Sequence, residues 1–286
     1  MPAAAPSSAF RRPFRAQAVL FDLDGTLIDS APDLQAAVNR LLLAMERRPL
    51  DIDQVKAMIG DGAAKLVERA MAASGAAATA EALPELVQRF MRLYTGSNAV
   101  QRTTAYAGVP ETLAALGARG LKLAVCTNKP YRATMGILSA LKLTDHFAEV
   151  VGGDSLAQRK PDPAPARHLL EKLGVGAEAA VMVGDSANDV ATGRGAGLAC
   201  IAVSWGYSAV PPERLGADRV VDRFADIPAA IAALEREGLK GALAQMVPAA
   251  VSDLGATLSA AGAGAADSLK PVGRVLRRMF KPARKR

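Results

Sequence analysis

The sequence is poor in the residues that build disulfide scaffolds, zinc sites and histidine-based active sites. Its 286 residues include two cysteines, Cys126 and Cys200, and two histidines, His146 and His168. Both cysteines lie in apolar segments typical of strands, so we expect buried, reduced thiols and no disulfide framework or zinc site. Neither histidine has a Cys or acidic partner at ligand spacing, so we expect structural or surface roles for both. This composition favours a cytoplasmic protein.

Long apolar runs are also missing. No segment approaches the roughly 20 consecutive apolar residues that a membrane-spanning helix requires. The first 15 residues combine Ala, Pro and Ser with Arg11, Arg12 and Arg15, but they lack the apolar stretch of a secretory signal. We expect residues 1–15 to form a disordered leader.

Net charge is confined to one end of the chain. Residues 240–286 hold nine Lys or Arg against Asp253 and Asp267, which accounts for the whole formal charge of +7. We expect a low-complexity basic tail here, and a disordered, solubilising role is the simplest interpretation. Its weakly amphipathic end also allows contact with an anionic surface, although we expect no sequence-specific recognition of nucleic acid. A catalytically weak binding module that docks through this tail is the alternative of a different class.

Strands and helices alternate along the second part of the chain. Strands are expected at residues 121–126, 149–151, 180–183, 199–203 and 220–221, and helices at 110–119, 132–141, 163–173, 189–196 and 227–237. This alternation predicts an α/β fold with a doubly wound, mostly parallel sheet. Residues 30–101 show helical patterns only, the first at 31–48, so we expect an all-helical cap inserted into a Rossmann-like core of residues 16–29 and 102–239. A monomer or a homodimer fits the sequence.

The first strand ends in two carboxylates. Asp22 and Asp24 follow the apolar run Val19-Leu20-Phe21 and lie on the same side of an extended chain. Ligands of open α/β sheets bind beyond the carboxyl ends of the strands, so these acids suggest a cation and an anionic substrate. Two carboxylates this close repel each other, so either a metal ion keeps both ionised or one of them holds a proton. A carboxylate held by a metal can act as a nucleophile, and a neighbour that can hold a proton can act as a general acid and base. Taken alone, however, the pair is more typical of an Asp-rich turn.

Three further segments place polar residues at strand ends or helix starts. Thr127-Asn128 follows a strand, where a hydroxyl and turn amides can donate to phosphate oxygens or can cap a helix. Lys160 stands in a Lys-Pro-x-Pro segment, whose prolines hold the ammonium at a helix start. Asp185 and Asp189 follow another strand and, four residues apart, could converge on one cation or act as a helix cap and a dipole partner.

In this order and placement, the four segments resemble the four motifs of the haloacid dehalogenase-like superfamily, and the resemblance extends from about residue 16 to 239. It implies a Mg²⁺-dependent phosphatase that acts through an aspartyl-phosphate. The roles implied are Asp22 as nucleophile, Asp24 as general acid and base, and Thr127, Asn128 and Lys160 as phosphoryl-group ligands. The Mg²⁺ ligands implied are Asp22, Asp185 and the backbone carbonyl of Asp24, with Asp189 binding the ion either directly or through water. The dehalogenases of the superfamily lack the second carboxylate, so Asp24 indicates phosphoryl transfer.

Two segments, one beside the expected cap and one within it, narrow the range of possible substrates. The segment Asp29 to Leu34 and the segment Ile59 to Ala70, which contains Gly60-Asp61-Gly62, resemble bacterial phosphoglycolate phosphatases. The resemblance implies 2-phosphoglycolate as the substrate, with the backbone amides of this turn approaching its carboxylate as the cap closes. A helix N-cap formed by Asp61 between flexible glycines is the alternative interpretation of the turn. Sugar-phosphate phosphatase, pyrophosphatase and phosphosugar mutase are the alternative activities.

Overall fold

Six parallel strands form the centre of the core, in the order β5-β4-β1-β6-β7-β8. The strands are β1 (Ala18–Phe21), β4 (Lys122–Cys126), β5 (Glu149–Val151), β6 (Ala180–Gly184), β7 (Ala199–Val203) and β8 (Arg219–Val221). This computed structural model describes residues 14–94 and 100–239. The central strands are almost wholly apolar, as expected of a parallel sheet that is covered on both faces. The predicted fold class is therefore confirmed.

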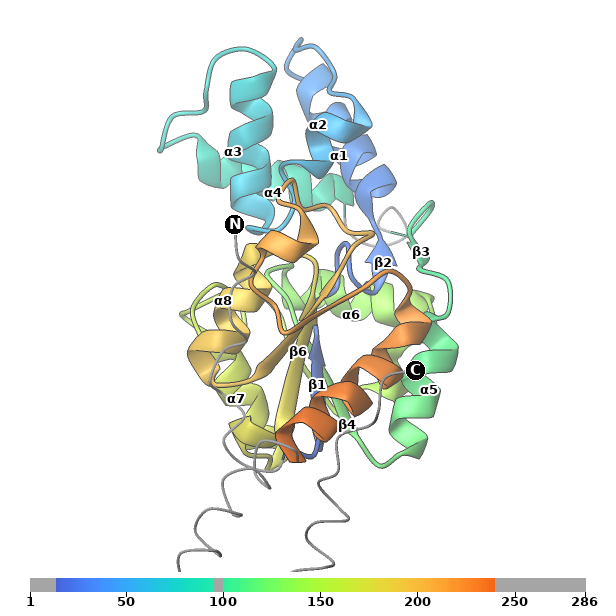
Figure 1. The fold of residues 1–286 in the computed structure, drawn as a ribbon. Helices are drawn as coiled ribbons and strands as arrows, with labels where there is room; N and C mark the ends of the chain where they lie inside the picture. Colours follow the sequence, from blue (N-terminus) through green and yellow to red (C-terminus); the bar gives the residue numbers. More distant parts are fainter. Residues whose placement is uncertain (1–13, 95–99, 240–286) are drawn as a thin grey trace, which may run out of the picture.

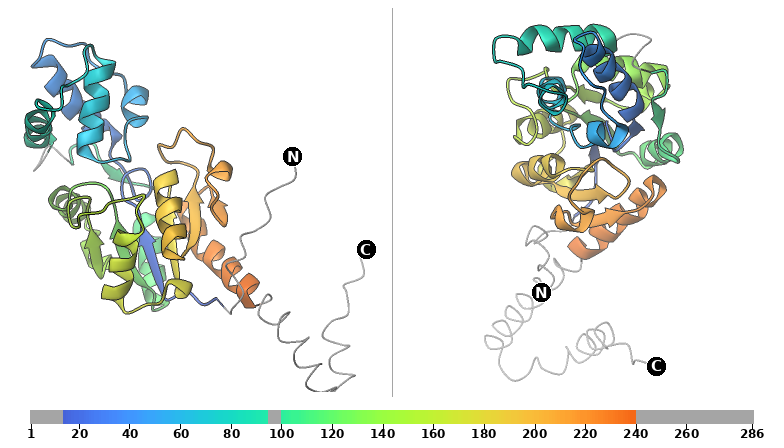
Figure 2. Two further views of the ribbon diagram at one scale, coloured as in Figure 1. Left: turned by 90° about the vertical axis from the view of Figure 1, so that its left-hand side faces the viewer. Right: turned by 90° about the horizontal axis from the view of Figure 1, so that it is seen from above.

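Helices cover both faces of the sheet (Figures 1 and 2). Helices α5 (Val109–Ala118) and α6 (Tyr131–Ala140), with the helix at residues 227–239, pack on one face. Helices α7 (Ala164–Leu173) and α8 (Ala187–Ala196) pack on the other. Successive residues of a strand point to opposite faces, so Val19 and Phe21 join the first layer while Ala18 and Leu20 join the second.

Four helices form a separate layer beyond the carboxyl edge of the sheet (Figure 1). They are α1 (Ala31–Leu43), α2 (Ile52–Lys56), α3 (Ala63–Ala73) and α4 (Leu83–Tyr94), and all lie between β1 and β4 in the chain. This is the predicted helical insertion. The chain enters and leaves it through a short antiparallel ribbon of β2 (Ile28–Asp29) and β3 (Thr104–Ala105). The sequence did not indicate this ribbon because two residues per strand are too few for a periodic pattern.

Most predicted elements of the core fall within one or two residues of their observed bounds. The first cap helix is an exception, because it ends at Leu43 rather than continuing to residue 48. Glu46 takes a left-handed backbone conformation with φ of 56°, which is incompatible with a right-handed helix, so the helix ends before it reaches Pro49. Of the predicted leader only Phe14 and Arg15 are described, and Phe14 is buried. The predicted tail lies outside the described residues. No helix among the described residues has both the length and the hydropathy of a membrane span.

Candidate active site

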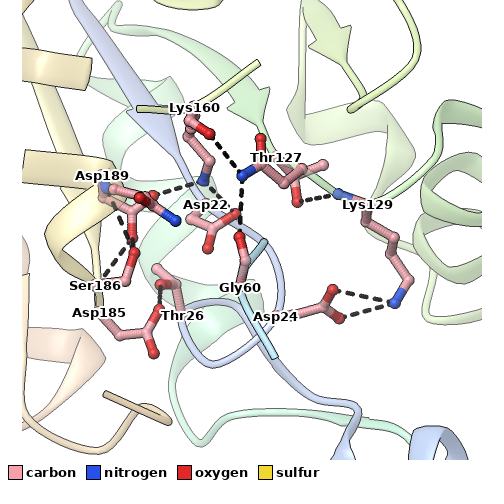
Figure 3. A network of polar contacts seen from close by, with 12 residues as sticks. Asp22, Asp24, Thr26, Gly60, Thr127, Lys129, Lys160, Asp185, Ser186 and Asp189 are labelled. Atoms are coloured by element: carbon pink, nitrogen blue, oxygen red, sulfur yellow. Dashed lines mark hydrogen bonds and ion pairs between the residues drawn. The ribbon is translucent and has the colours of Figure 1, made fainter. Parts of the chain in front are cut away.

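The predicted catalytic residues converge at the carboxyl edge of the sheet, beneath the cap (Figure 3). Asp22 follows β1, Thr127 follows β4 and Asp185 follows β6, three strands that are neighbours in the sheet. Lys160 reaches the same place from the loop before α7, and Asp189 from the first turn of α8. All five side chains are buried. Residues up to 167 positions apart in the sequence are thus gathered because parallel strands end at one edge.

Three of the acids form a compact cluster. Asp22, Asp185 and Asp189 each offer a carboxylate oxygen within 4.8 Å of the others. Burial raises the pKa of Asp22 to about 6, against the opposing effect of the Lys160 ammonium. Burial and then the charge of Asp189 raise the pKa of Asp185 to about 8. Keeping all three ionised requires a cation, so the cluster can hold a metal ion.

Lys160 compensates part of this charge. Its Nζ lies 2.7 Å from Asp22 Oδ1 and 2.5 Å from Asp189 Oδ1. Burial opposes the charged form of Lys160, but Asp189 and Asp22 outweigh it and raise its pKa. The second oxygen of Asp189 accepts hydrogen bonds from the backbone and hydroxyl of Ser186, which is the N-cap of α8. Asp185 lies before this helix, so it does not share a helix face with Asp189, although their four-residue spacing is compatible with one. The two carboxylates come together because β6 ends directly before Asp185.

Asp185 is held by the backbone and by close packing. Its Oδ2 accepts a hydrogen bond of 2.7 Å from the Tyr207 backbone N–H, and its Oδ1 lies 3.3 Å from the Thr26 hydroxyl. A Cβ at Gly206 would come within 2.1 Å of Asp185 Cβ, so only glycine fits there. No lysine or arginine pairs with Asp185 among the described residues, in contrast to Asp22 and Asp189.

Asn128 connects this site to the cap. Its Nδ2 donates to the backbone oxygens of Lys160 and Gly60, both at 3.0 Å. Its Oδ1 is buried without a hydrogen-bond partner in the described part of the chain, so an acceptor remains for a ligand. The neighbouring Thr127 hydroxyl accepts the Lys129 backbone N–H at 3.2 Å and keeps its own hydrogen for another acceptor.

Lys129 is a site residue that the sequence did not indicate. Its side chain is only 3% exposed, and its Nζ lies 3.0 and 3.1 Å from the two carboxylate oxygens of Asp24. The Ser30 hydroxyl donates to the same carboxylate at 2.5 Å, and the Lys129 Nζ stands 4.6 Å from the ring centroid of Tyr94 in α4. Burial opposes the charge, but Asp24 and Tyr94 together raise the pKa of Lys129. The one available signal was its place between Thr127-Asn128 and Pro130, where a solvated lysine is the usual outcome.

The turn Gly60-Asp61-Gly62 contacts the core directly. Asp61 Oδ1 accepts a hydrogen bond of 2.7 Å from the Asn188 side chain in α8, and Oδ2 pairs with Arg69 in α3. Gly62 has a φ of +86°, and a Cβ there would lie 3.1 Å from the backbone oxygen of Asn128. The N-cap of α3 is Gly62, without a side-chain hydrogen bond, so the alternative prediction of an Asp61 cap is wrong.

Tyr207 ties the site to the entrance of the cap. Its hydroxyl donates to Asp29 Oδ1 at 2.7 Å and accepts the backbone N–H groups of Ser30 and Ala31 at 2.8 and 3.1 Å. Because its backbone N–H also holds Asp185, one residue contacts both the acidic cluster and the first linker. In the same loop, Trp205 packs against the rings of Tyr106 and Phe224, whereas Tyr207 makes polar contacts.

A pocket lies between the cap and the core, and Asp22, Asp24, Asn128 and Lys129 form its polar end. The cap contributes the apolar side chains of Leu34, Ile59, Ala63, Leu66, Phe90 and Met91 and the ring of Tyr94. A second, more polar opening lined by Asp61, Arg69, Asp185 and Asn188 leads to the acidic cluster. The site is therefore approached between the two layers of the molecule.

Comparisons with known proteins agree with this arrangement. A family model described as haloacid dehalogenase-like hydrolase matches residues 19–203. The phosphoglycolate phosphatase of Rhodospirillum rubrum is 47% identical over 215 residues, which cover 74% of this chain and 89% of that protein. A solved structure described as a predicted phosphoglycolate phosphatase from Haemophilus somnus has a TM-score of 0.72 at 35% identity, covering 75% of this chain and 97% of that one. CbbY from Rhodobacter sphaeroides, solved in complex with xylulose-(1,5)bisphosphate, has a TM-score of 0.61 at 26% identity. This match covers 74% of this chain and 96% of that one.

Proposed function

The chain belongs to the haloacid dehalogenase-like hydrolase family, and we propose that it hydrolyses 2-phosphoglycolate to glycolate and phosphate through an aspartyl-phosphate on Asp22. One observation carries this proposal. One buried cluster contains Asp22, Asp185, Asp189 and Lys160, and Asp24 lies beside it, two residues after Asp22. Such a cluster is suited to binding and transferring a phosphoryl group.

The residues divide the reaction between them. The Asp22 carboxylate attacks phosphorus and forms an acyl phosphate, while Asp24 gives a proton to the departing glycolate oxygen. Asp24 then takes a proton from water, which attacks the acyl phosphate and releases inorganic phosphate with the Asp22 carboxylate restored. Lys160 lies 2.7 Å from Asp22 and stabilises the negative charge of the transferring group, and the Thr127 hydroxyl and the backbone N–H of Asn128 donate to its oxygens.

The acidic cluster fits Mg²⁺, which prefers one or two carboxylates together with substrate and water oxygens. Three buried acids face a single ammonium, so a divalent cation would balance the remaining charge. We propose Asp22, Asp185 and the backbone carbonyl of Asp24 as its ligands. Asp189 contributes through water, since both of its oxygens are already bound by Lys160 and Ser186. A bound Mg²⁺ would supply charge neutralisation at the phosphoryl group.

The pocket favours a small substrate. Among the described residues that line it, only Tyr94 brings a polar side chain from the cap. A sugar phosphate needs several partners for its hydroxyl groups, which this apolar wall does not supply. The phosphoglycolate phosphatase of Rhodospirillum rubrum, at 47% identity, supports the same substrate. The likeness to CbbY makes a sugar-phosphate phosphatase the second candidate.

A substrate panel tests the proposal. The full chain is assayed with Mg²⁺ on 2-phosphoglycolate, ribose 5-phosphate, glucose 6-phosphate and pyrophosphate, and phosphate release is measured. We expect kcat/KM for 2-phosphoglycolate to exceed that of the other substrates by at least about tenfold. Asp22→Asn is the control for contaminating phosphatases, and its kcat should fall at least about 10⁴-fold because an amide is a poor nucleophile. A sugar phosphate hydrolysed faster than 2-phosphoglycolate contradicts the substrate, and an active Asp22→Asn contradicts the nucleophile.

The remaining expectations stay predictions. Cys126 and Cys200 are free and buried, which supports the reducing, cytoplasmic setting inferred from the sequence. The division at residues 16–29, 30–101 and 102–239, the monomeric or dimeric state and the contact of the basic tail with an anionic surface are likewise proposals.

A further inference from the structure

Lys129 is a buried cation that the proposed chemistry does not use. Lysines are rarely buried unless they are paired, and its partner is the carboxylate of Asp24. Lys160 serves the phosphoryl group on the other side of Asp22, next to Asp189 (Figure 3). The two lysines therefore lie at different parts of the site.

The position of Asp24 identifies the part of the substrate that Lys129 faces. A general acid must lie beside the oxygen of the leaving group, because that oxygen receives its proton. The Lys129 ammonium contacts both oxygens of Asp24, so it lies on the leaving-group side as well. It also lines the pocket between cap and core, and it is the only basic side chain among the described residues that do so.

We propose that Lys129 binds a carboxylate on the leaving group and thereby selects phosphate esters of small hydroxy acids. The proposal rests on the proposed function and deepens it. In 2-phosphoglycolate one methylene separates the carboxylate from the ester oxygen, so a cation beside the general acid lies within reach of both. An ammonium has three donors and can bridge Asp24 and a second carboxylate. The Tyr94 ring, 4.6 Å from the ammonium, stabilises the positive charge of Lys129 and adds no carboxylate that would compete with the one on the substrate.

Lys129 could instead only position Asp24, and a pair of substrates separates the two roles. Ethyl phosphate has the same ester as 2-phosphoglycolate with a methyl group in place of the carboxylate. Lys129→Met keeps an unbranched side chain, one atom shorter, and removes its charge. We expect kcat/KM for 2-phosphoglycolate to fall about 100-fold, mainly through KM, and the value for ethyl phosphate, which reports only the loss of the Asp24 partner, to fall at least about tenfold less. Equal losses on both substrates would overturn the recognition role.

Three further variants make the test complete. Lys129→Arg keeps the charge and should retain most of the preference for 2-phosphoglycolate. Lys122→Met removes the lysine at the start of β4, the strand that precedes the Lys129 loop, and should leave both substrates unaffected. If Lys129→Met does not fold, Lys129→Gln carries the same expectation. A wild-type enzyme that does not prefer 2-phosphoglycolate over ethyl phosphate contradicts the proposed function, whereas a preference that survives in Lys129→Met or Lys129→Gln contradicts only the role of Lys129.

Discussion

The four aspartates of the site have different neighbours, and these neighbours give the four carboxylates different roles. Asp22 and Asp185 are buried acids whose pKa values are raised to about 6 and about 8, so a cation must keep them ionised. Asp189 is fixed by Lys160 and Ser186 and serves to hold that lysine. Asp24 is separated from this cluster by its own pair with Lys129 and its bond to Ser30. Environment rather than residue type thus sets each role.

The role of Asp24 predicts a dependence on the leaving group. Asp24→Asn removes the proton donor, so kcat for 2-phosphoglycolate should fall about 10²–10⁴-fold. p-Nitrophenolate is a weak base that departs without a proton, so formation of the acyl phosphate from p-nitrophenyl phosphate should be affected far less. Pre-steady-state release of p-nitrophenol measures this first step alone. An equally slow first step on both substrates contradicts the assignment of Asp24 as general acid.

At the residue scale, the sequence indicated residues that the fold brings together where a short motif contains them. Asp22, Lys160 and Asp185 could be named because each stands in a short, recognisable segment at a strand end or helix start. Lys129 and Tyr207 could not, because their partners Asp24 and Asp29 lie 105 and 178 positions away in the sequence. A lysine and a tyrosine in loops give no periodic signal of such contacts, and only the fold brings them together.

At the scale of elements, the cap turn and the start of α8 form a polar contact across the pocket. The Asn188 side chain donates to Asp61, and the Asn128 side chain donates to the backbone of Gly60. Both donors belong to loops or helix starts that also carry site residues. We therefore expect these contacts to couple closure of the cap to completion of the site.

This coupling predicts a binding defect in Asn188→Ala. Asp61 would keep Arg69 but lose its core partner, so the closed arrangement would be less populated and the apparent affinity would fall with it. We expect KM for 2-phosphoglycolate to rise about tenfold, because a hydrogen bond to a charged group is lost, with a smaller change in kcat. Glu68→Gln, which breaks the exposed Lys65–Glu68 pair on the same cap helix as Arg69, is the control and should leave KM unchanged. An unchanged KM in Asn188→Ala would show that this contact does not govern closure.

The elements themselves were largely predictable because each has a clear period or composition. The apolar runs of β1, β4, β6 and β7 and the amphipathic spacing of the helices gave bounds close to those observed. The end of α1 at Leu43 was not predictable, since it depends on a left-handed Glu46, a residue with no intrinsic preference for that conformation. The β2–β3 ribbon depends on a pairing between Ile28 and Ala105, which is equally invisible in sequence.

For the whole molecule, the acidic cluster makes stability depend on pH and metal together. Asp22 and Asp185 bind protons more tightly in the folded protein than in the unfolded chain, where their pKa is near 3.8. The folded state therefore gains stability from this site at low pH and loses it as pH rises through about 6 and then about 8. A divalent cation bound at this cluster would favour the ionised form and offset the loss, and its affinity would rise with pH because fewer protons must be displaced.

Thermal unfolding measured with and without Mg²⁺ tests this linkage. After treatment with EDTA, we expect the melting temperature to fall between pH 5.5 and pH 9 by several degrees, since about 2–4 °C corresponds to each kcal/mol in a chain of this size. Adding Mg²⁺ should raise the melting temperature more at pH 8.5 than at pH 5.5. Asp185→Asn removes the acid with the higher of the two shifted pKa values, so it should flatten the metal-free pH profile and shrink the Mg²⁺ effect at pH 8.5. A Mg²⁺ shift that is equal at both pH values, or that survives unchanged in Asp185→Asn, would place the ion away from this cluster.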